Sequence, residues 1–220
     1  MMKRNITRFA WTAPLFVALL FNNPQVIAYN HDIDVTSIKQ DSSHEIQKLL
    51  THYEETAARL KESTKGLTEE QLHFIPGEDQ WSISQCLEHI VLSEPMIFAM
   101  FKQEISKPTS SETPSEPSNS DEEIIKSITD RSEKYQAPEM LKPTGKYKTV
   151  EEALTAFKNG RKEILDYIKN ADIKALRTHI SQGPAGPVDG YQNLLFITTH
   201  SDRHILQIEE IKARPDYPKK

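Results

Sequence analysis

Apolar residues recur at three- and four-residue steps in four long stretches of the chain, which is the spacing of amphipathic helices. The first apolar set ends before Gly66, a natural stop, so the pattern predicts a helix over about residues 43–65. A second helix begins after Ser82, because the Ser82 hydroxyl and the side chain of Gln85 can complete a capping box.

The second helix extends toward Ile105. Pro95 inside it predicts a kink or a restart, because proline removes a backbone donor. Thr149 opens a third helix, with Glu152 in the capping-box position. A fourth helix is expected from about Val188 to Lys212.

The connections are polar or rich in Gly and Pro. We expect a short turn after Thr68, a short helix within residues 121–133, and a mobile insert over the Ser/Pro-rich residues 107–120. The segment from His179 to Gly190 is expected to be a loop, and no segment shows the two-residue alternation of a strand. The sequence therefore predicts an all-α four-helix bundle, up-down-down-up or similar, with that insert after the second helix.

The first 28 residues have the three-part pattern of a secretory signal peptide. The basic residues Lys3, Arg4 and Arg8 precede the uncharged run Phe9–Phe21. Val26 and Ala28 then supply the small or apolar residues at the cleavage positions. The apolar run is shorter than the about 20 residues of a membrane-spanning helix, although an uncleaved anchor is the alternative. We expect an exported protein, periplasmic or secreted, with no membrane span after signal removal. Its predicted parts are the signal peptide (1–28), an arm (29–42), the helical domain (43–213) and a tail (214–220).

Signal removal takes away three positive charges and no negative one, which lowers the formal net charge from −5 to −8. No basic patch or stripe remains, so nucleic acid is not an expected partner. Cys86 is the only cysteine. An internal disulfide is therefore excluded, and stability has to come from the core and from any bound metal.

Three histidines are candidate metal ligands. His200 and His204 are four residues apart, which places them on one helix face about 5–6 Å apart at Cβ. Such a pair occurs often by chance, and its alternative is a polar helix face. Both lie beside the apolar face of the fourth helix, and His89 is similarly placed in the second. Buried imidazoles need partners, so a shared cation is favoured. Three protein ligands with one open position are typical of a catalytic metal site.

Two stretches resemble motifs of the DinB-like superfamily. PGEDQWSISQCLEHIVLSE resembles the second-helix motif, in which a tryptophan and a serine open the helix and a histidine follows eight residues after the tryptophan. GPAGPVDGYQNLLFITTHSDRHILQIEEIK resembles the last-helix motif, in which a Gly/Pro turn leads into a helix with HxxRH. Each motif alone is degenerate, but their order and spacing together are specific, and the resemblance covers about residues 43–213.

The resemblance implies a four-helix bundle that binds a divalent metal, often nickel or zinc, through His89, His200 and His204. Family members include thiol-dependent transferases and isomerases and putative metal-dependent hydrolases of the YfiT type. Dimers are common in the family, which makes a homodimer a candidate assembly. The long Ser/Pro-rich insert departs from the family pattern. Export also disfavours a thiol transferase, because low-molecular-weight thiols are scarce outside the cytoplasm.

Other residues near the histidines have two interpretations each. Trp81 is favoured as a packing anchor over a pocket residue, and Cys86 as a small core residue over a ligand. His52 is favoured as a surface histidine over a fourth ligand or proton shuttle, and His179 is a candidate to overhang the site. The remaining histidines, His31, His44 and His73, are expected to be exposed.

Three acids, Glu88, Glu94 and Asp202, are the nearest candidates for a general base. Glu88 and Asp202 adjoin predicted ligands, so helix geometry rotates them about 100° away from the metal. They suit the surface, or contacts behind the ligands, better than the role of base. Arg203 is expected either to pair with an acid across the bundle or to be solvated.

Two functions are compatible with these residues, beside a metal-free interaction domain with packed histidines. The first is an exported metal-dependent hydrolase or transferase that acts on a small-molecule substrate at the three-histidine site. The alternative is a non-catalytic protein of the cell envelope that binds a metal or a small ligand.

Overall fold

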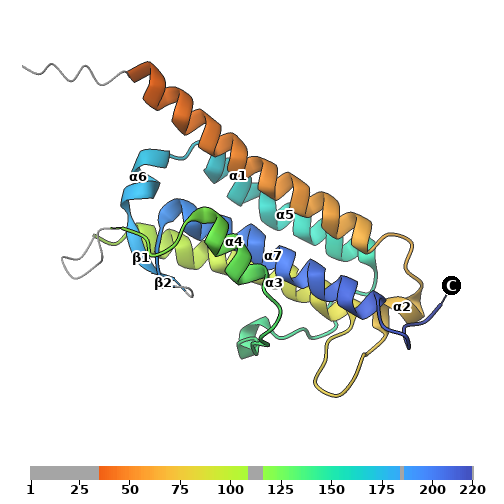
Figure 1. Ribbon diagram of the computed structural model, residues 1–220. Coiled ribbons are helices and arrows are strands. Elements are labelled where there is room, and N and C mark those ends of the chain that lie inside the picture. Colours follow the sequence, from red (N-terminus) through yellow and green to blue (C-terminus); the bar gives the residue numbers. More distant parts are fainter. Residues whose placement is uncertain (1–34, 109–115, 184–185, 220) are drawn as a thin grey trace, which may run out of the picture. The chain divides into compact units, whose positions relative to one another are not determined.

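The computed structural model describes residues 35–108, 116–183 and 186–219. In chain order the elements are α1 (Val35–Ser63), α2 (Glu69–His73), α3 (Ile83–Ile105), α4 (Asp121–Thr129), the 3-10 turn η1 (Glu139–Leu141), α5 (Val150–Lys169), α6 (Ile173–Thr178), β1 (Ile180–Gly183), β2 (Gly186–Asp189) and α7 (Gly190–Lys212) (Figure 1). The described chain is thus mostly helical, as predicted. The expected signal peptide over residues 1–28 lies outside the described residues.

The four long helices α1, α3, α5 and α7 lie side by side (Figure 1). Helix α1 packs against α5 and α7, and helix α3 also packs against α5 and α7, so the contacts close a ring. The shorter helix α4 packs on α7. None of the helices in the described ranges combines the length and the hydropathy that crossing a bilayer requires.

The ends of the first two long helices follow the sequence signals, with one difference. Helix α1 begins at Val35, so residues 35–42 are helical and do not belong to a loose arm. The helix ends at Ser63, and Gly66 follows with a φ of 64°, a left-handed conformation that favours glycine. Helix α3 has the predicted capping box of Ser82 and Gln85 and continues through Pro95 as a single helix.

Helix α5 is capped on one side only. The Thr149 hydroxyl accepts a hydrogen bond from the backbone N–H of Glu152, as predicted. The Glu152 carboxylate, however, accepts from the backbone N–H of Lys148 at 2.9 Å and not from that of Thr149. The predicted short elements after Thr68 and within residues 121–133 are helices α2 and α4.

The prediction of a plain loop between His179 and Gly190 is wrong. Residues 180–183 and 186–189 form an antiparallel hairpin in which Ile180 pairs with Asp189 and Ser181 with Val188. The backbone N–H of Ser118 also donates to the carbonyl of Pro187 at 2.9 Å, which ties the end of the Ser/Pro-rich insert to this hairpin. Residues 109–115 of the insert lie outside the described part of the chain.

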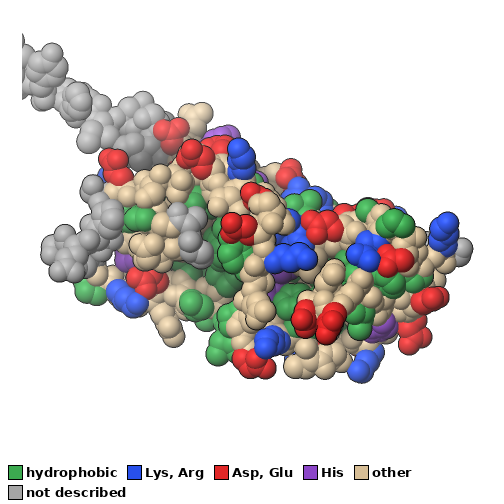
Figure 2. All heavy atoms as spheres, turned by 60° about the horizontal axis from the view of Figure 1, so that its bottom comes forward, with side chains coloured by type: hydrophobic (Ala, Val, Ile, Leu, Met, Phe, Trp, Pro, Cys, Tyr) green, Lys and Arg blue, Asp and Glu red, His purple; other side chains and the backbone are tan. Residues whose placement is uncertain are grey.

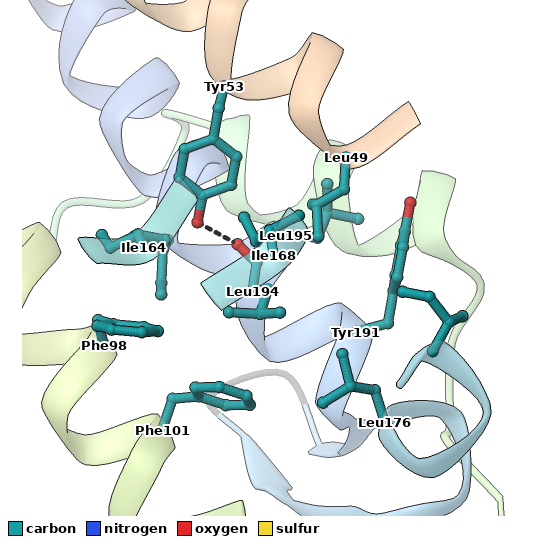
Figure 3. Packing of buried hydrophobic residues seen from close by; sticks show 12 residues of the cluster. Leu49, Tyr53, Phe98, Phe101, Ile164, Ile168, Leu176, Tyr191, Leu194 and Leu195 are labelled. Atoms are coloured by element: carbon teal, nitrogen blue, oxygen red, sulfur yellow. Dashed lines mark hydrogen bonds between the residues drawn. The ribbon is translucent and has the colours of Figure 1, made fainter. Parts of the chain in front are cut away.

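The core has two apolar clusters with a polar layer between them. One cluster contains Leu49, Tyr53, Phe98, Ile164 and Leu194, among others, and Figure 3 shows their packing. The other contains Leu60, Ile83, Leu87, Phe157 and Ile208, among others. Between them along the helices lie buried polar residues: Thr56, Ser93, Glu94, Arg161, Thr198 and Ser201. This layer lies beside the candidate site.

The surface carries charges of both signs. On the face shown in Figure 2, lysine and arginine side chains are interspersed with aspartate and glutamate side chains. No broad area of one sign is visible on that face.

Candidate metal site

His89 from α3 and His200 and His204 from α7 lie together in the structure. One ring nitrogen of each lies within 4.8 Å of the other two. The Nε2 atoms of His200 and His204 are 3.4 Å apart. Nitrogens that share a tetrahedral zinc ion at 2.0–2.1 Å are about 3.3 Å apart, so this pair already has the spacing of two ligands.

The far nitrogen of each ring has a polar partner. His89 Nδ1 lies 2.9 Å from the carbonyl oxygen of Leu141. A carbonyl only accepts, so Nδ1 carries the proton and Nε2 carries the lone pair that a metal needs. His204 Nδ1 lies 3.0 Å from Gln207 Oε1, which accepts in the same way. Hydrogen bonds of this kind fix the tautomer and the ring orientation of metal-binding histidines.

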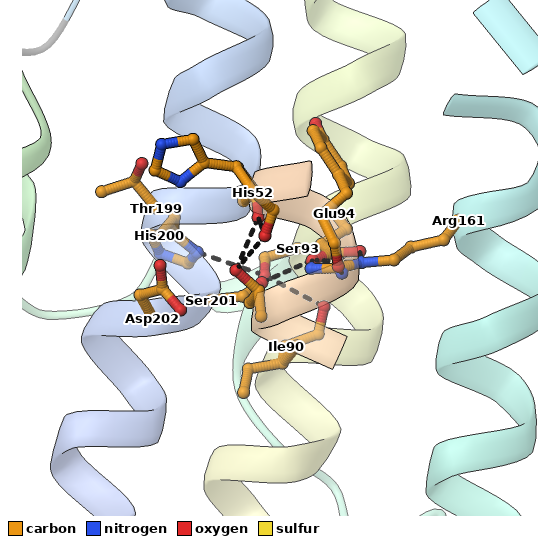
Figure 4. A network of polar contacts seen from close by, with 12 residues as sticks. His52, Ile90, Ser93, Glu94, Arg161, Thr199, His200, Ser201 and Asp202 are labelled. Atoms are coloured by element: carbon orange, nitrogen blue, oxygen red, sulfur yellow. Dashed lines mark hydrogen bonds and ion pairs between the residues drawn. The ribbon is translucent and has the colours of Figure 1, made fainter. Parts of the chain in front are cut away.

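The third ring, His200, has a serine partner. Its Nδ1 lies 3.4 Å from Ser93 Oγ, and that hydroxyl donates to the carbonyl of Ile90 (Figure 4). The Ser93 oxygen is therefore left to accept from His200 Nδ1–H. All three Nε2 atoms are thereby left with lone pairs. Lone pairs facing each other at 3.4 Å repel unless a proton or a cation lies between them, so this donor set fits a divalent metal ion.

The environment keeps the three imidazoles neutral. Burial lowers the pKa of His200 to about 3, with further lowering by His89 and Arg203. Burial, then the neighbouring His200 and His89, place the pKa of His204 well below its ordinary value. Burial also lowers the pKa of His89, opposed in part by the hydrogen bond to Leu141. Neutral imidazole is the form that binds metal, so the site needs little deprotonation before binding.

Trp81 packs directly against the histidines. Its ring centroid is 4.8 Å from that of His89 and 6.0 Å from that of His204. The indole is partly exposed and also contacts the apolar cluster of α3. The two interpretations of Trp81 therefore coexist, because the ring is a packing residue that forms a wall of the site.

Glu88 is buried behind the ligands and is unavailable as a base. Its carboxylate accepts four hydrogen bonds of 2.7–3.0 Å, from the backbone N–H groups of Thr144, Gly145 and Lys146 and from the Thr144 hydroxyl. Burial alone raises the pKa of Glu88, but these hydrogen bonds outweigh it, so the pKa lies below its ordinary value. The Glu88 carboxylate therefore holds the loop of residues 144–146 in place.

Glu94 is likewise engaged, in the polar layer of Figure 4. Arg161 donates to both of its carboxylate oxygens at 2.6–3.1 Å, and the Ser201 hydroxyl donates to it at 2.5 Å. Both partners of the Glu94–Arg161 ion pair are almost completely buried. Glu94 is therefore a structural residue, and sequence reasoning did not identify its partner.

Asp202 and Arg203 point away from the histidines. Asp202 forms an ion pair with Arg59 of α1 at 2.7 Å. Within the described part of the chain Arg203 forms no ion pair, and it is only 8% exposed, so neither expected arrangement is found. Its guanidinium donates to the backbone carbonyls of Ile128, Asp130 and Glu133 and holds the segment after α4.

The other candidate residues do not join the site. Within the described ranges, the group of His, Cys, Asp and Glu side chains arranged to hold a metal is His89, His200 and His204. Cys86 is fully buried in the core, and burial raises its pKa to about 12, which keeps it a neutral thiol. His52 and His179 are partly exposed, and His44 and His73 are exposed as predicted. His31 lies outside the described residues.

Comparison with known proteins identifies the family of the chain. The model of the DinB superfamily matches residues 52–208, so the chain belongs to that superfamily. The chain is also 24% identical to the uncharacterized protein YuaE of Bacillus subtilis (strain 168) over 159 residues, which cover 68% of this chain and 88% of YuaE. No solved structure matches the chain.

Proposed function

We propose that this protein is an exported metal-dependent enzyme, a hydrolase or transferase that acts on a small molecule at a site formed by His89, His200 and His204. The observation that carries the proposal is the convergence of three neutral imidazoles whose Nδ1 atoms are all engaged. These three imidazoles would hold a divalent ion such as nickel or zinc, which would supply Lewis-acid chemistry to a bound substrate.

The surrounding residues support a site that binds an ion and excludes bulk water on most sides. His89 is 3% exposed and His204 8%, whereas His200 is partly exposed, so the His200 side of the group lies nearest to solvent. The ring of Phe196 lies beside His200, with 5.9 Å between the ring centroids, and the ring of Trp81 packs against His89 and His204. Both rings are suited to contact apolar parts of a substrate. The acids Glu88, Glu94 and Asp202 are all engaged elsewhere, so the proposal assigns none of them as base.

Metal analysis of the purified protein tests this proposal. We expect about one equivalent of nickel or zinc per chain after loading and desalting, and a large loss of metal in His204→Ala. Because the ion binds only the folded state, it should also raise the melting temperature of the wild type and not that of the variant.

The matched control is His73→Ala, which removes an exposed histidine bonded to Ser84. This variant should retain the metal content of the wild type. Equal metal content in wild type and His204→Ala would contradict the proposed site.

Export has its own test. If residues 1–28 are a signal peptide, the protein recovered from the periplasm or medium of an expressing bacterium should begin at Tyr29. N-terminal sequencing or intact mass measures this directly. Protein found only in the cytoplasm, with residues 1–28 still attached, would contradict export without affecting the metal site.

A non-catalytic metal- or ligand-binding role is the second candidate. The engagement of all three nearby acids favours it, because hydrolases that use metal-bound water need a base within reach. Loss of any measured turnover on chelation, with recovery on adding nickel or zinc, would decide for the enzyme.

A further inference from the structure

The connection between α4 and α5 passes directly beside the candidate metal site. This connection, residues 130–149, contains no helix except the single turn η1, and it contacts α3 through that turn (Figure 1). Its Leu141 carbonyl is the group that accepts from His89 Nδ1. The orientation of one predicted ligand therefore depends on where this connection lies.

Apolar packing does little to hold the connection in place. Within residues 130–149, Leu141 has the one buried side chain, and large apolar residues are exposed, with Tyr135 at 75% and Met140 at 70%. A segment with so little buried apolar area does not offset the entropy cost of its own ordering. Polar contacts have to fix its position.

Two charged residues make most of those contacts, and each lies immediately before a histidine of the site. A further contact is the ion pair of Arg131 with Glu210 of α7 at 2.7 Å. Glu88, before His89, receives four hydrogen bonds from residues 144–146. Arg203, before His204, donates to the carbonyls of Ile128, Asp130 and Glu133. Hydrogen bonds to charged groups are stronger than those between neutral groups, and each residue makes several of them.

The positions of Glu88 and Arg203 follow from helix geometry. Successive residues of a helix are about 100° apart, so when the histidine points into the site the residue before it points to the side. In this structure both side chains contact the same connection, Glu88 near its end and Arg203 near its start. Leu141 lies between these two attachment points. Helices α3 and α7 therefore carry both the histidines of the site and the two residues that attach the connection.

We propose that Glu88 and Arg203 are positioning residues, which hold the α4–α5 connection against the three-histidine site and thereby set its metal affinity. The inference rests on the proposed metal site. Release of the connection frees the Leu141 carbonyl, so His89 loses the partner that fixes its ring and its tautomer. Loss of such an outer partner typically weakens metal binding about 10–100-fold.

The first test compares zinc affinity, measured by competition with a chelator, in the wild type, Glu88→Gln and Arg203→Met. Both variants should bind zinc about 10–100-fold more weakly. In cobalt-loaded protein, the visible absorption of the metal should also change, because the geometry at His89 changes. Wild-type affinity and spectrum in both variants would overturn the inference.

Arg177→Met is the matched control. Arg177 also makes several charged hydrogen bonds, to Glu45, Asp121 and Asp189, but none to residues 130–149. This variant should lose stability and keep the zinc affinity of the wild type. An equal loss of affinity in Arg177→Met would show that general destabilisation, and not the connection, sets the affinity.

The second test needs no substitution. If the connection orients His89, metal binding must in turn stabilise the connection, because coupling between two sites is reciprocal. Hydrogen exchange of wild-type peptides covering residues 130–149 should slow on zinc addition, including the amides that donate to Glu88. Unchanged exchange in a protein that binds zinc would overturn the inference, whereas failure of the wild type to bind metal would contradict the proposed function itself.

Discussion

At the scale of single residues, the three histidines differ in the group that holds the far side of each ring. His89 uses a backbone carbonyl of a distant segment, His204 an amide one helical turn away, and His200 a serine of the opposite helix. The partners of His200 and His204 are side chains, so their contribution can be removed by substitution. The Ser93 hydroxyl is the simplest of these to test.

Ser93→Ala removes the acceptor of His200 Nδ1–H and leaves a hydrogen-bonding group without its partner. We expect metal affinity to fall about tenfold, at the low end of the range for such partners. The free energy of unfolding without metal should also fall, by about 1–3 kcal/mol, because the N–H of His200 loses its acceptor. Ser201→Ala is the control, since Ser201 is equally buried but its hydroxyl donates to Glu94 and not to a histidine. Metal affinity should therefore be lower in Ser93→Ala than in Ser201→Ala. Equal metal affinity in the two variants would contradict the role of Ser93.

The residues of the site differ in how far sequence identifies them. His200 and His204 are visible from local spacing, and His89 from its position beside an apolar helix face. The roles of Glu88 and Arg203 were not predicted, because all of their partners in residues 128–146 except the Thr144 hydroxyl are backbone groups. Backbone partners leave no pattern of side-chain types in a sequence. Geometry alone reveals them.

At the scale of secondary structure, the predicted capping box of α3 is confirmed, whereas that of α5 is only half formed. Ser82 and Gln85 form the predicted box at α3, and Asp189 with Gln192 forms one at α7. The hairpin of residues 180–189 was missed, because strands of four residues are too short to show alternation. Tertiary contacts hold it, including the bond from Asn193 to Ser181.

The cap of α3 offers a test at this scale. Ser82→Ala removes the acceptor for the Gln85 N–H, so we expect a loss of about 1 kcal/mol in the free energy of unfolding. Ser82→Gly should cost only a few tenths of a kcal/mol, because glycine is tolerated at an N-cap. Urea unfolding of the two variants measures the order. A larger loss for glycine than for alanine would show that Ser82 acts as an ordinary helical residue and not as the cap.

At the scale of the whole molecule, one buried arginine joins the four long helices. Arg161 of α5 pairs with Glu94 of α3, donates to the Tyr53 carbonyl of α1, and is linked through Glu94 to Ser201 of α7 (Figure 4). Its guanidinium also lies 4.2 Å from the ring centroid of Phe157. The metal site, in contrast, spans only α3 and α7. The Arg161–Glu94 network and the three-histidine site should therefore affect stability in different ways.

Removing one partner of a buried ion pair leaves the other charge uncompensated. We expect Glu94→Gln or Arg161→Met each to cost about 3–5 kcal/mol in the free energy of unfolding. The double variant should cost less than the sum of the two, because the partners are coupled. Zinc should still stabilise each folded variant, since neither residue contacts His89, His200 or His204. His204→Ala should show the converse, a loss confined to the zinc-dependent increment. Additive losses in the double variant would contradict the coupling, and loss of the zinc increment in Arg161→Met would show that the network also holds the site.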